Sequence, residues 1–277
     1  MKVLKMRSIS LRVLRTIAIA IILFLALLYF FQRPLIFPGA YHLHSKEKIE
    51  SNLPIIKLTT PDGVEIQLLK ASSEKETDRA ILMLHGNADL ASNQIQHLNR
   101  ADILDLGFNV YALEYRGYNE NKGYPSENTL NIDALTALQY LEKQGYKKII
   151  YYGHSIGTGV ATRLVKEKTP FALILESPFN NLAKAAHYAF PFIPKPVTDV
   201  LLKDEFASDE TLATTEVPHV LIMHAQDDPV LNFHMGEDLF KKVKSPHKVF
   251  IESQTGGHND VLLFKRKDLI EFLKSLD

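Results

Sequence analysis

The pentapeptide Gly-His-Ser-Ile-Gly at residues 153–157 could carry nucleophilic chemistry. It matches the motif G-x-S-x-G, in which a serine sits on a strained turn between a strand and a helix, with its hydroxyl exposed at the sheet edge. The glycines on either side leave room where the strand and the helix pass close together. The strand-like residues 148–152 precede it and a helical pattern continues to about Glu167, so we predict that Ser155 is a nucleophile. The alternative is an ordinary strand-to-helix turn.

A serine nucleophile needs a general base, and the base needs a carboxylate to orient it. When the serine occupies such a turn, the order along the chain is serine, acid, histidine. His258 lies on a glycine-rich loop after a predicted strand, and Asp228 lies on an acidic loop after the strand before it. We therefore predict His258 as the base and Asp228 as the acid, with His247 and Asp227 as the alternatives. Three other histidines are expected to be structural, because they lie in the turn or beside a strand: His154, His219 and His224.

The loop His-Gly-Asn-Ala at residues 85–88 follows a buried apolar strand. Acyl transfer passes through a tetrahedral oxyanion, and each preorganised N–H group that holds it is worth ~3–4 kcal/mol. We predict that the backbone N–H groups of Asn87 and Ile156 form this oxyanion hole, helped by the positive end of the helix after Ser155. The alternative is a turn that uses glycine and asparagine only for its shape.

Predicted strands alternate with predicted helices from residue 55 onward, which indicates an α/β fold with a mostly parallel sheet and helices on both faces. Ligands of such sheets bind at the carboxyl ends of the strands, where all of these loops fall. A hairpin is expected around residues 61–63. The strands are expected at 55–60, 64–70, 80–84, 109–114, 148–152, 173–176, 220–224 and 248–251, and the helices at 90–106, 130–144, 157–167, 233–243 and 267–276.

Residues 180–213 interrupt this alternation and are predicted to form a helical cap above the nucleophile. Residues 183–202 are rich in aromatic and aliphatic side chains, which suits a pocket for an acyl chain. The alternative is a helical pair that simply packs on the core. An acidic cluster nearby is expected to be a solvated face: Asp204, Glu205, Asp209 and Glu210.

The amino terminus contains an apolar run, Thr16–Phe31, with further apolar residues at 35–37 after a break at 32–34. Five basic residues precede it: Lys2, Lys5, Arg7, Arg12 and Arg15. This pattern predicts one membrane-spanning helix with a cytoplasmic amino terminus and an exported domain, in the periplasm, the extracellular space or a lumen. A cleaved signal peptide is the alternative, although no small-x-small cleavage site follows the run. We predict a tail and anchor at 1–35, a connector at 36–54 and a catalytic domain at 55–277.

The composition is that of an ordinary globular protein, since 46% of the 277 residues are hydrophobic and 23% are charged. The net charge of zero gives no indication of a nucleic-acid partner. The absence of cysteine excludes disulfides and thiol nucleophiles. His42 and His44 lie two apart in the connector, and without a third ligand we expect surface residues rather than a metal site.

Several strings of the chain together resemble the membrane-anchored serine lipases of the α/β-hydrolase superfamily. They are LHGNA at 84–88, EYRGY at 114–118, PSE at 125–127, GHSIGTGVA at 153–161, LILESPF at 173–179, FASDE at 206–210 and HAQDDPV at 224–230. The resemblance implies the triad Ser155, Asp228 and His258, and ester hydrolysis without a metal or an organic cofactor. Asn119 and Asn121 depart from it, because relatives usually carry glycine and serine there.

The expected function is therefore that of a serine hydrolase that cleaves carboxylic esters, with the resemblance favouring lipid-like substrates such as a monoacylglycerol or a lysophospholipid. A thioesterase or a serine peptidase would use the same triad, because the triad does not encode the leaving group. A catalytically silent, membrane-tethered binding module is the alternative from another class. Nothing in the sequence indicates an oligomeric state.

Overall fold

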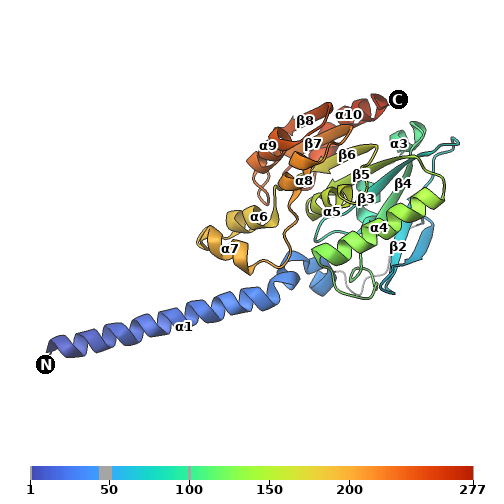
Figure 1. Ribbon diagram of the computed structural model, residues 1–277. Helices are drawn as coiled ribbons and strands as arrows, with labels where there is room; N and C mark the ends of the chain where they lie inside the picture. Colours follow the sequence, from blue (N-terminus) through green and yellow to red (C-terminus); the bar gives the residue numbers. More distant parts are fainter. Residues whose placement is uncertain (1, 44–51, 99–100, 277) are drawn as a thin grey trace.

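The computed structural model describes residues 2–43, 52–98 and 101–276. A long helix, α1 (Lys2–Ile36), projects from an α/β domain, and a short π-helical turn, η1 (Gly39–Leu43), follows it. In Figure 1 most of α1 extends away from the domain, and its carboxyl-terminal part meets it. The segment Leu11–Ile36 is long and apolar enough to cross a membrane, which agrees with the predicted anchor.

The domain is built on an eight-stranded sheet in the order β1-β2-β4-β3-β5-β6-β7-β8. The strand β2 runs antiparallel to both of its neighbours, and all other pairs are parallel. The predicted hairpin is confirmed by the pairing of β1 with β2. The strands are β1 (Ile55–Thr59), β2 (Glu65–Ala71), β3 (Arg79–Leu84), β4 (Asn109–Glu114), β5 (Lys148–His154), β6 (Ala172–Glu176), β7 (His219–Ala225) and β8 (His247–Ser253).

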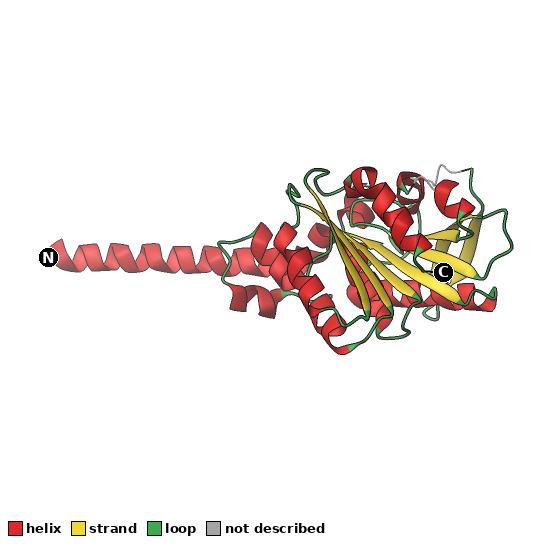
Figure 2. Cartoon of the chain, turned by 90° about the horizontal axis from the view of Figure 1, so that it is seen from above, coloured by secondary structure: helices red, strands yellow, loops and turns green. Residues whose placement is uncertain are grey.

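Helices cover both faces of this twisted sheet, as Figure 2 shows and as the alternating pattern predicted. Each face has its own apolar cluster. On one face lie α4 (Glu127–Lys143), α5 (Ile156–Val165), α8 (Ser208–Thr214) and α9 (Phe233–Lys242). On the other lie α2 (Ala91–His97), α3 (Ala101–Asp105) and α10 (Val261–Lys274). The mostly parallel α/β architecture expected from the sequence is confirmed.

Two helices differ from their prediction. The continuous helix expected at 90–106 is wrong, since the chain forms α2 and α3 instead, with residues 99–100 outside the described part. Ile95 and Leu98 of one segment and Ile103 of the other are buried in the same half of the core, so apolar spacing did not reveal the interruption. The last helix, α10, is kinked at Lys265, so the helix expected at 267–276 corresponds to its second part, and an additional helical segment at 261–264 precedes the kink.

The junction between α1 and the domain is short. The polar residues at 32–34 interrupt the apolar run but not the helix, since α1 continues through Pro34 to Ile36, one residue past the predicted end of the anchor. Phe37 is then fully buried in the core of the domain, and Ala40 lies beside the same cluster. The chain that leaves the apolar helix is therefore fixed to the domain at once. His44 of the predicted connector lies outside the described residues.

Two members of the acidic cluster are buried, so the expectation of a solvated face is wrong for them. Asp204 is 3% exposed, contacts Arg33 of α1 at 3.4 Å and accepts a hydrogen bond from the Glu127 amide. Asp209 is 4% exposed and pairs with Lys184 and Lys242 on two different helices. Both carboxylates join segments that are far apart in the sequence, which local charge patterning does not reveal.

The remaining two helices, α6 (Leu182–Ala189) and α7 (Lys195–Leu201), lie within the predicted cap. They contact each other and, through α7, the carboxyl-terminal part of α1. Figure 1 shows both beside that end of α1.

Candidate active site

The turn between β5 and α5 has the geometry that the motif predicts. Ser155 stands between the last residue of the strand and the first of the helix, with φ 53° and ψ −121°. Such a backbone is strained for a residue other than glycine and is found where the surrounding structure enforces it. A Cβ atom on Gly157 would lie 2.0 Å from the Leu84 carbonyl oxygen, and one on Gly153 would lie 2.4 Å from that of Gly157. Strand and helix therefore approach as closely as the sequence indicated.

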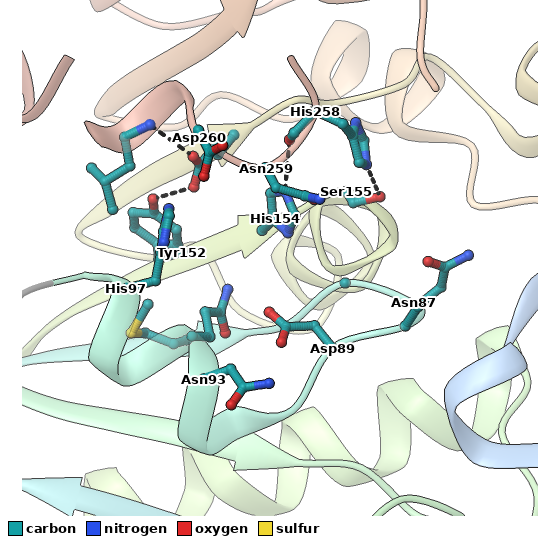
Figure 3. A pocket seen from close by; sticks show the side chains of 16 residues that line it. Asn87, Asp89, Asn93, His97, Tyr152, His154, Ser155, His258, Asn259 and Asp260 are labelled. Carbon is teal, nitrogen blue, oxygen red and sulfur yellow. Dashed lines mark hydrogen bonds between the residues drawn. The ribbon is translucent and has the colours of Figure 1, made fainter. Parts of the chain in front are cut away.

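The side chains predicted as nucleophile, base and acid are brought together in one hydrogen-bonded row. His258 Nε2 lies 2.8 Å from Ser155 Oγ, and His258 Nδ1 lies 2.8 Å from Asp228 Oδ2. Figure 3 shows the first of these contacts as a dashed line between the two side chains. The alternatives lie elsewhere. Asp227 accepts the Gly257 amide at 2.8 Å, and His247 stacks on another histidine at the start of its strand.

Asp228 is held by four donors. Its Oδ1 atom accepts the backbone N–H groups of Val230 and Leu231 at 2.8 and 2.9 Å. Its Oδ2 atom contacts His258 Nδ1 and also His224 Nε2, the latter at 3.1 Å. Burial alone would raise the pKa of Asp228, but the hydrogen bonds from His224 and His258, the charge of His258 and the Leu231 amide together hold it well below its usual value. Both oxygen atoms of the Asp228 carboxyl group are therefore hydrogen-bonded, which holds the side chain in one orientation.

His224 contributes to the site although the sequence suggested only a structural role. Its side chain is fully buried at the end of β7, and Nε2 lies 3.1 Å from both Asp228 Oδ2 and the Leu231 carbonyl oxygen. Because both partners are acceptors, Nε2 carries the proton. Gly236 makes room for the ring, since a Cβ there would lie 2.5 Å from Nδ1. The signal available in the sequence was a histidine four residues before the acid.

The loop that carries His258 is fixed through its backbone. The His258 carbonyl oxygen accepts hydrogen bonds from His154 Nε2 and Ser177 Oγ, both at 3.1 Å. Ser177 adopts a left-handed backbone with φ 47° directly after β6. His154, which directly precedes Ser155 and is expected to be structural, therefore links the turn around Ser155 to the loop that carries His258.

The loop after β3 passes directly beside Ser155. A Cβ on Gly86 would lie 3.5 Å from Ser155 Cβ. The next residue, Asn87, is bound to the end of α1: its Nδ2 donates to the Ile36 carbonyl at 3.1 Å, and its own carbonyl accepts the Gly39 amide at 3.1 Å. The Tyr118 hydroxyl donates to the same carbonyl at 2.8 Å. The two predicted oxyanion donors thus belong to a loop against Ser155 and to the first turn of α5, whose N–H groups have no partner within the helix.

Residues at the end of β4 and in the turn that follows it contact the loop after β3. His85 and Glu114 are fully buried with 3.1 Å between Nε2 and Oε1. Glu114 also accepts the side-chain amide of Asn119, while Asn121 donates to the Glu114 carbonyl at 3.1 Å. The two asparagines that depart from the resemblance are therefore buried hydrogen-bond donors. Burial alone would lower the pKa of His85, but the charge and contact of Glu114 raise it.

A cavity of about 320 Å³ opens beside Ser155. Three carboxylic side chains line it, Asp89, Glu176 and Asp260, and Figure 3 shows Asp89 and Asp260 on different sides of it. No lysine or arginine and no residue of the predicted cap lines it in the described part of the chain. Likewise, no group of three histidine or acidic side chains is placed to hold a metal ion among those residues.

Residues 79–193 match the profile of the α/β hydrolase fold. An uncharacterised protein of Mycobacterium tuberculosis is 31% identical over 198 residues, which cover 70% of this chain and 68% of that protein. The chain belongs to the α/β-hydrolase family. In this fold the nucleophilic serine lies on a turn between a strand and a helix, and the acid and the histidine follow it in that order along the chain. Ser155, Asp228 and His258 occur in this arrangement.

Two further relatives of this α/β hydrolase are lysophosphatidylserine lipases named ABHD12. That of Rattus norvegicus is 37% identical over 188 residues, 61% of this chain and 46% of its own length, and that of Danio rerio is 36% identical over 216 residues, 70% and 56%. The chain therefore spans about half the length of these curated relatives. Among solved structures, an esterase from Pyrococcus furiosus superposes with a TM-score of 0.68 at 17% identity, over 85% of this chain and 98% of the esterase.

Proposed function

We propose that this protein is a membrane-tethered serine hydrolase that cleaves carboxylic esters of lipid-like substrates through an acyl-enzyme. The observation that carries the proposal is the unbroken row of contacts from Ser155 through His258 to Asp228, with 2.8 Å at each step. The names of the relatives support the ester chemistry and the lipid substrate, because lipases and esterases share this machinery.

In the first half of the reaction, Ser155 Oγ attacks the carbonyl carbon of the ester while His258 Nε2 takes its proton. Asp228 accepts the N–H on the far side of the imidazole and stabilises the imidazolium that forms. The Asn87 and Ile156 N–H groups hold the oxyanion. The tetrahedral intermediate then collapses, the alcohol leaves with the proton from His258, and the acyl group remains on Ser155.

In the second half, a water molecule attacks the acyl carbon and His258 again takes the proton. Collapse of this second intermediate releases the carboxylic acid and returns the proton to Ser155 Oγ. The strained backbone of Ser155 and the rigidly held Asp228 let both halves proceed with little movement of the protein, which is what preorganisation requires.

The acidic cavity supports a neutral, hydroxyl-bearing group next to the ester. Gln94 Nε2 donates to the Leu84 carbonyl at 3.2 Å, and its buried Oε1 has no partner among the described residues. A buried acceptor of this kind is stabilised by a hydroxyl donor. Asp89, Glu176 and Asp260 disfavour an anionic group by charge repulsion. We therefore infer a monoacylglycerol in preference to an anionic lysophospholipid.

We also propose that α1 spans the membrane once, with its amino terminus in the cytoplasm and the domain on the exported side. The apolar segment Leu11–Ile36 and the basic residues ahead of Thr16 support this orientation. In sealed membrane vesicles that expose the exported face, added protease should digest the domain. Protection of the domain in those vesicles until the membrane is permeabilised would reverse the orientation.

Ser155→Ala tests the chemistry. It should lower kcat for short-chain nitrophenyl esters by ~10³–10⁶-fold and abolish labelling by a fluorophosphonate, with the fold intact. Ser245→Ala, on the surface turn before β8, is the matched control and should behave as the wild type. Turnover retained in Ser155→Ala would refute the nucleophile. Comparison of kcat/KM on a monoacylglycerol and on lysophosphatidylserine tests the proposed leaving group. A higher kcat/KM on the anionic lipid would contradict the proposal of a monoacylglycerol substrate.

A further inference from the structure

The two cap helices expose large apolar side chains to their surroundings. Tyr188, Phe190, Phe192 and Val200 are 43%, 39%, 69% and 82% exposed, and they lie on α6, on α7 and on the turn between them. We call these four side chains the cap edge. Clusters of exposed aromatic and aliphatic side chains mark contact surfaces for a protein or a membrane.

The cap edge is continuous with the apolar surface of α1. The rings of Phe192 and Phe24 contact each other with 6.4 Å between their centroids, and Phe190 packs edge-on against Phe192 at 6.1 Å. A small apolar pocket of about 90 Å³ lies between α1 and the cap. Its lining includes Leu28, Leu35 and Ile36 from α1 and Phe190, Ile193 and Leu202 from the cap.

Polar contacts are made by residues of α1 that lie closer to the domain than Phe24. Gln32 Nε2 donates to the Leu201 carbonyl at 3.0 Å, and its Oε1 accepts the Lys203 amide at 2.8 Å. Arg33 pairs with the buried Asp204 at 3.4 Å. Charged and amide groups of this kind belong at the boundary between lipid and water, where snorkelling side chains also end. The boundary therefore lies near Gln32 and Arg33.

Phe24 lies eight residues before Gln32 toward the middle of the apolar segment. At the rise of an α-helix this is a depth of ~12 Å along the axis, and the hydrocarbon core of a bilayer is ~30 Å thick. Because the Phe192 ring contacts the Phe24 ring, it shares this hydrocarbon environment if α1 spans the membrane.

We propose that the cap edge is a second membrane-contact surface, embedded among the lipid acyl chains beside α1. Its occupant is the hydrocarbon of the bilayer. The exposed charges on α7 are compatible with this position, because Lys195 Nζ and Asp199 pair with each other at 2.7 Å, as charged groups near hydrocarbon do. The catalytic domain is then held by two surfaces against the membrane, which fixes its orientation as well as its distance.

The chain contains no tryptophan, so a single introduced tryptophan reports on its own surroundings. The experiment uses the full-length Phe192→Trp variant in phosphatidylcholine vesicles, with and without bromine in the acyl chains. Phe264→Trp is the matched control, since Phe264 is 57% exposed on α10, which Figure 1 shows at the end of the domain away from α1. Bromolipid should roughly halve the emission of Phe192→Trp or lower it further, and leave Phe264→Trp unchanged, because bromine quenches only at contact.

Each other outcome overturns the proposal. A Phe192→Trp emission that is water-like and unquenched would place the cap edge in solvent. An emission that is shifted to the blue but unquenched would place it against protein, such as a second copy of the chain. Neither readout depends on the chemistry at Ser155, so failure here leaves the proposed hydrolase activity standing.

Discussion

Replacement of Gly39 by alanine should reduce catalysis although the residue lies outside the catalytic row. The added Cβ would lie 2.8 Å from the Asn87 carbonyl oxygen and 2.3 Å from Tyr118 Cε1. To restore an ordinary contact of 3.4 Å, the Asn87 carbonyl must retreat by roughly 0.6 Å, unless Gly39 itself moves and weakens its 3.1 Å hydrogen bond to that carbonyl. In either case the Asn87 backbone loses support, because its carbonyl is displaced or its hydrogen bond from Gly39 is weakened.

Catalytic groups must be held within about 0.5 Å of their productive position. A displacement of ~1 Å can reduce the rate ~10²-fold, and complete loss of one oxyanion donor reduces kcat ~10²–10³-fold. We therefore expect Gly39→Ala to lower kcat by ~10–100-fold. The effect should fall on kcat more than on KM, because the oxyanion forms only in the transition state.

The assay is hydrolysis of a water-soluble nitrophenyl ester in detergent micelles, so that access to a membrane does not limit the rate. Gly63→Ala is the matched control: it also adds a methyl group to a glycine, at a turn with φ 81° and no atom within 4 Å of the new Cβ. It should lower stability by ~1–2 kcal/mol, because a side chain is strained at this φ, and leave kcat unaltered. A kcat for Gly39→Ala equal to that of the control, in a folded protein, would refute the link between the end of α1 and the oxyanion loop.

Three further outcomes are expected. Arg116→Ala leaves the fully buried Asp133 without its ion-pair partner, which should destabilise the domain by ~3–5 kcal/mol. In a calorimetric scan Tm should fall by about 6–20 °C. A fall in Tm smaller than that of a surface arginine variant would contradict this prediction. Gly157→Ala forces a Cβ to 2.0 Å from the Leu84 carbonyl oxygen and should abolish fluorophosphonate labelling, so normal labelling would count against a rigid turn at Ser155. Asp228 has a lowered pKa in the folded state, so its contribution to the unfolding free energy is complete above its unfolded pKa of ~3.9 and is lost as pH falls toward the folded value. Denaturant titrations should therefore show a steeper acid loss of stability for the wild type than for Asp228→Asn, and parallel profiles would refute the shift.

Much of the catalytic arrangement follows from local features of the sequence. The glycines around Ser155 permit a turn that few other residues could form, and the strand before it is apolar because both of its faces are buried. Parallel strands end at one edge of the sheet, so a histidine and an aspartate on loops after the last two strands were expected near that serine. The structure brings all three into contact.

Contacts between segments that are distant in the sequence could not be predicted in this way. His224 read as a strand residue, and only the folded loop turns Asp228 back onto it. Asp204 read as a surface acid, yet it is buried against Arg33, more than 170 residues away along the chain.

The sequence by itself determined the alternation of strands and helices, the strained turn at Ser155 and the order of the catalytic candidates, because each depends on backbone geometry and apolar periodicity within a short stretch. The tertiary structure alone decided that the apolar helix ends inside the domain core and binds the loop beside Ser155. Nothing in the local sequence around Ile36 or Asn87 indicates that these two residues contact each other. Their contact exists because chain segments compete for the same buried space, and that competition is resolved only when the whole core packs.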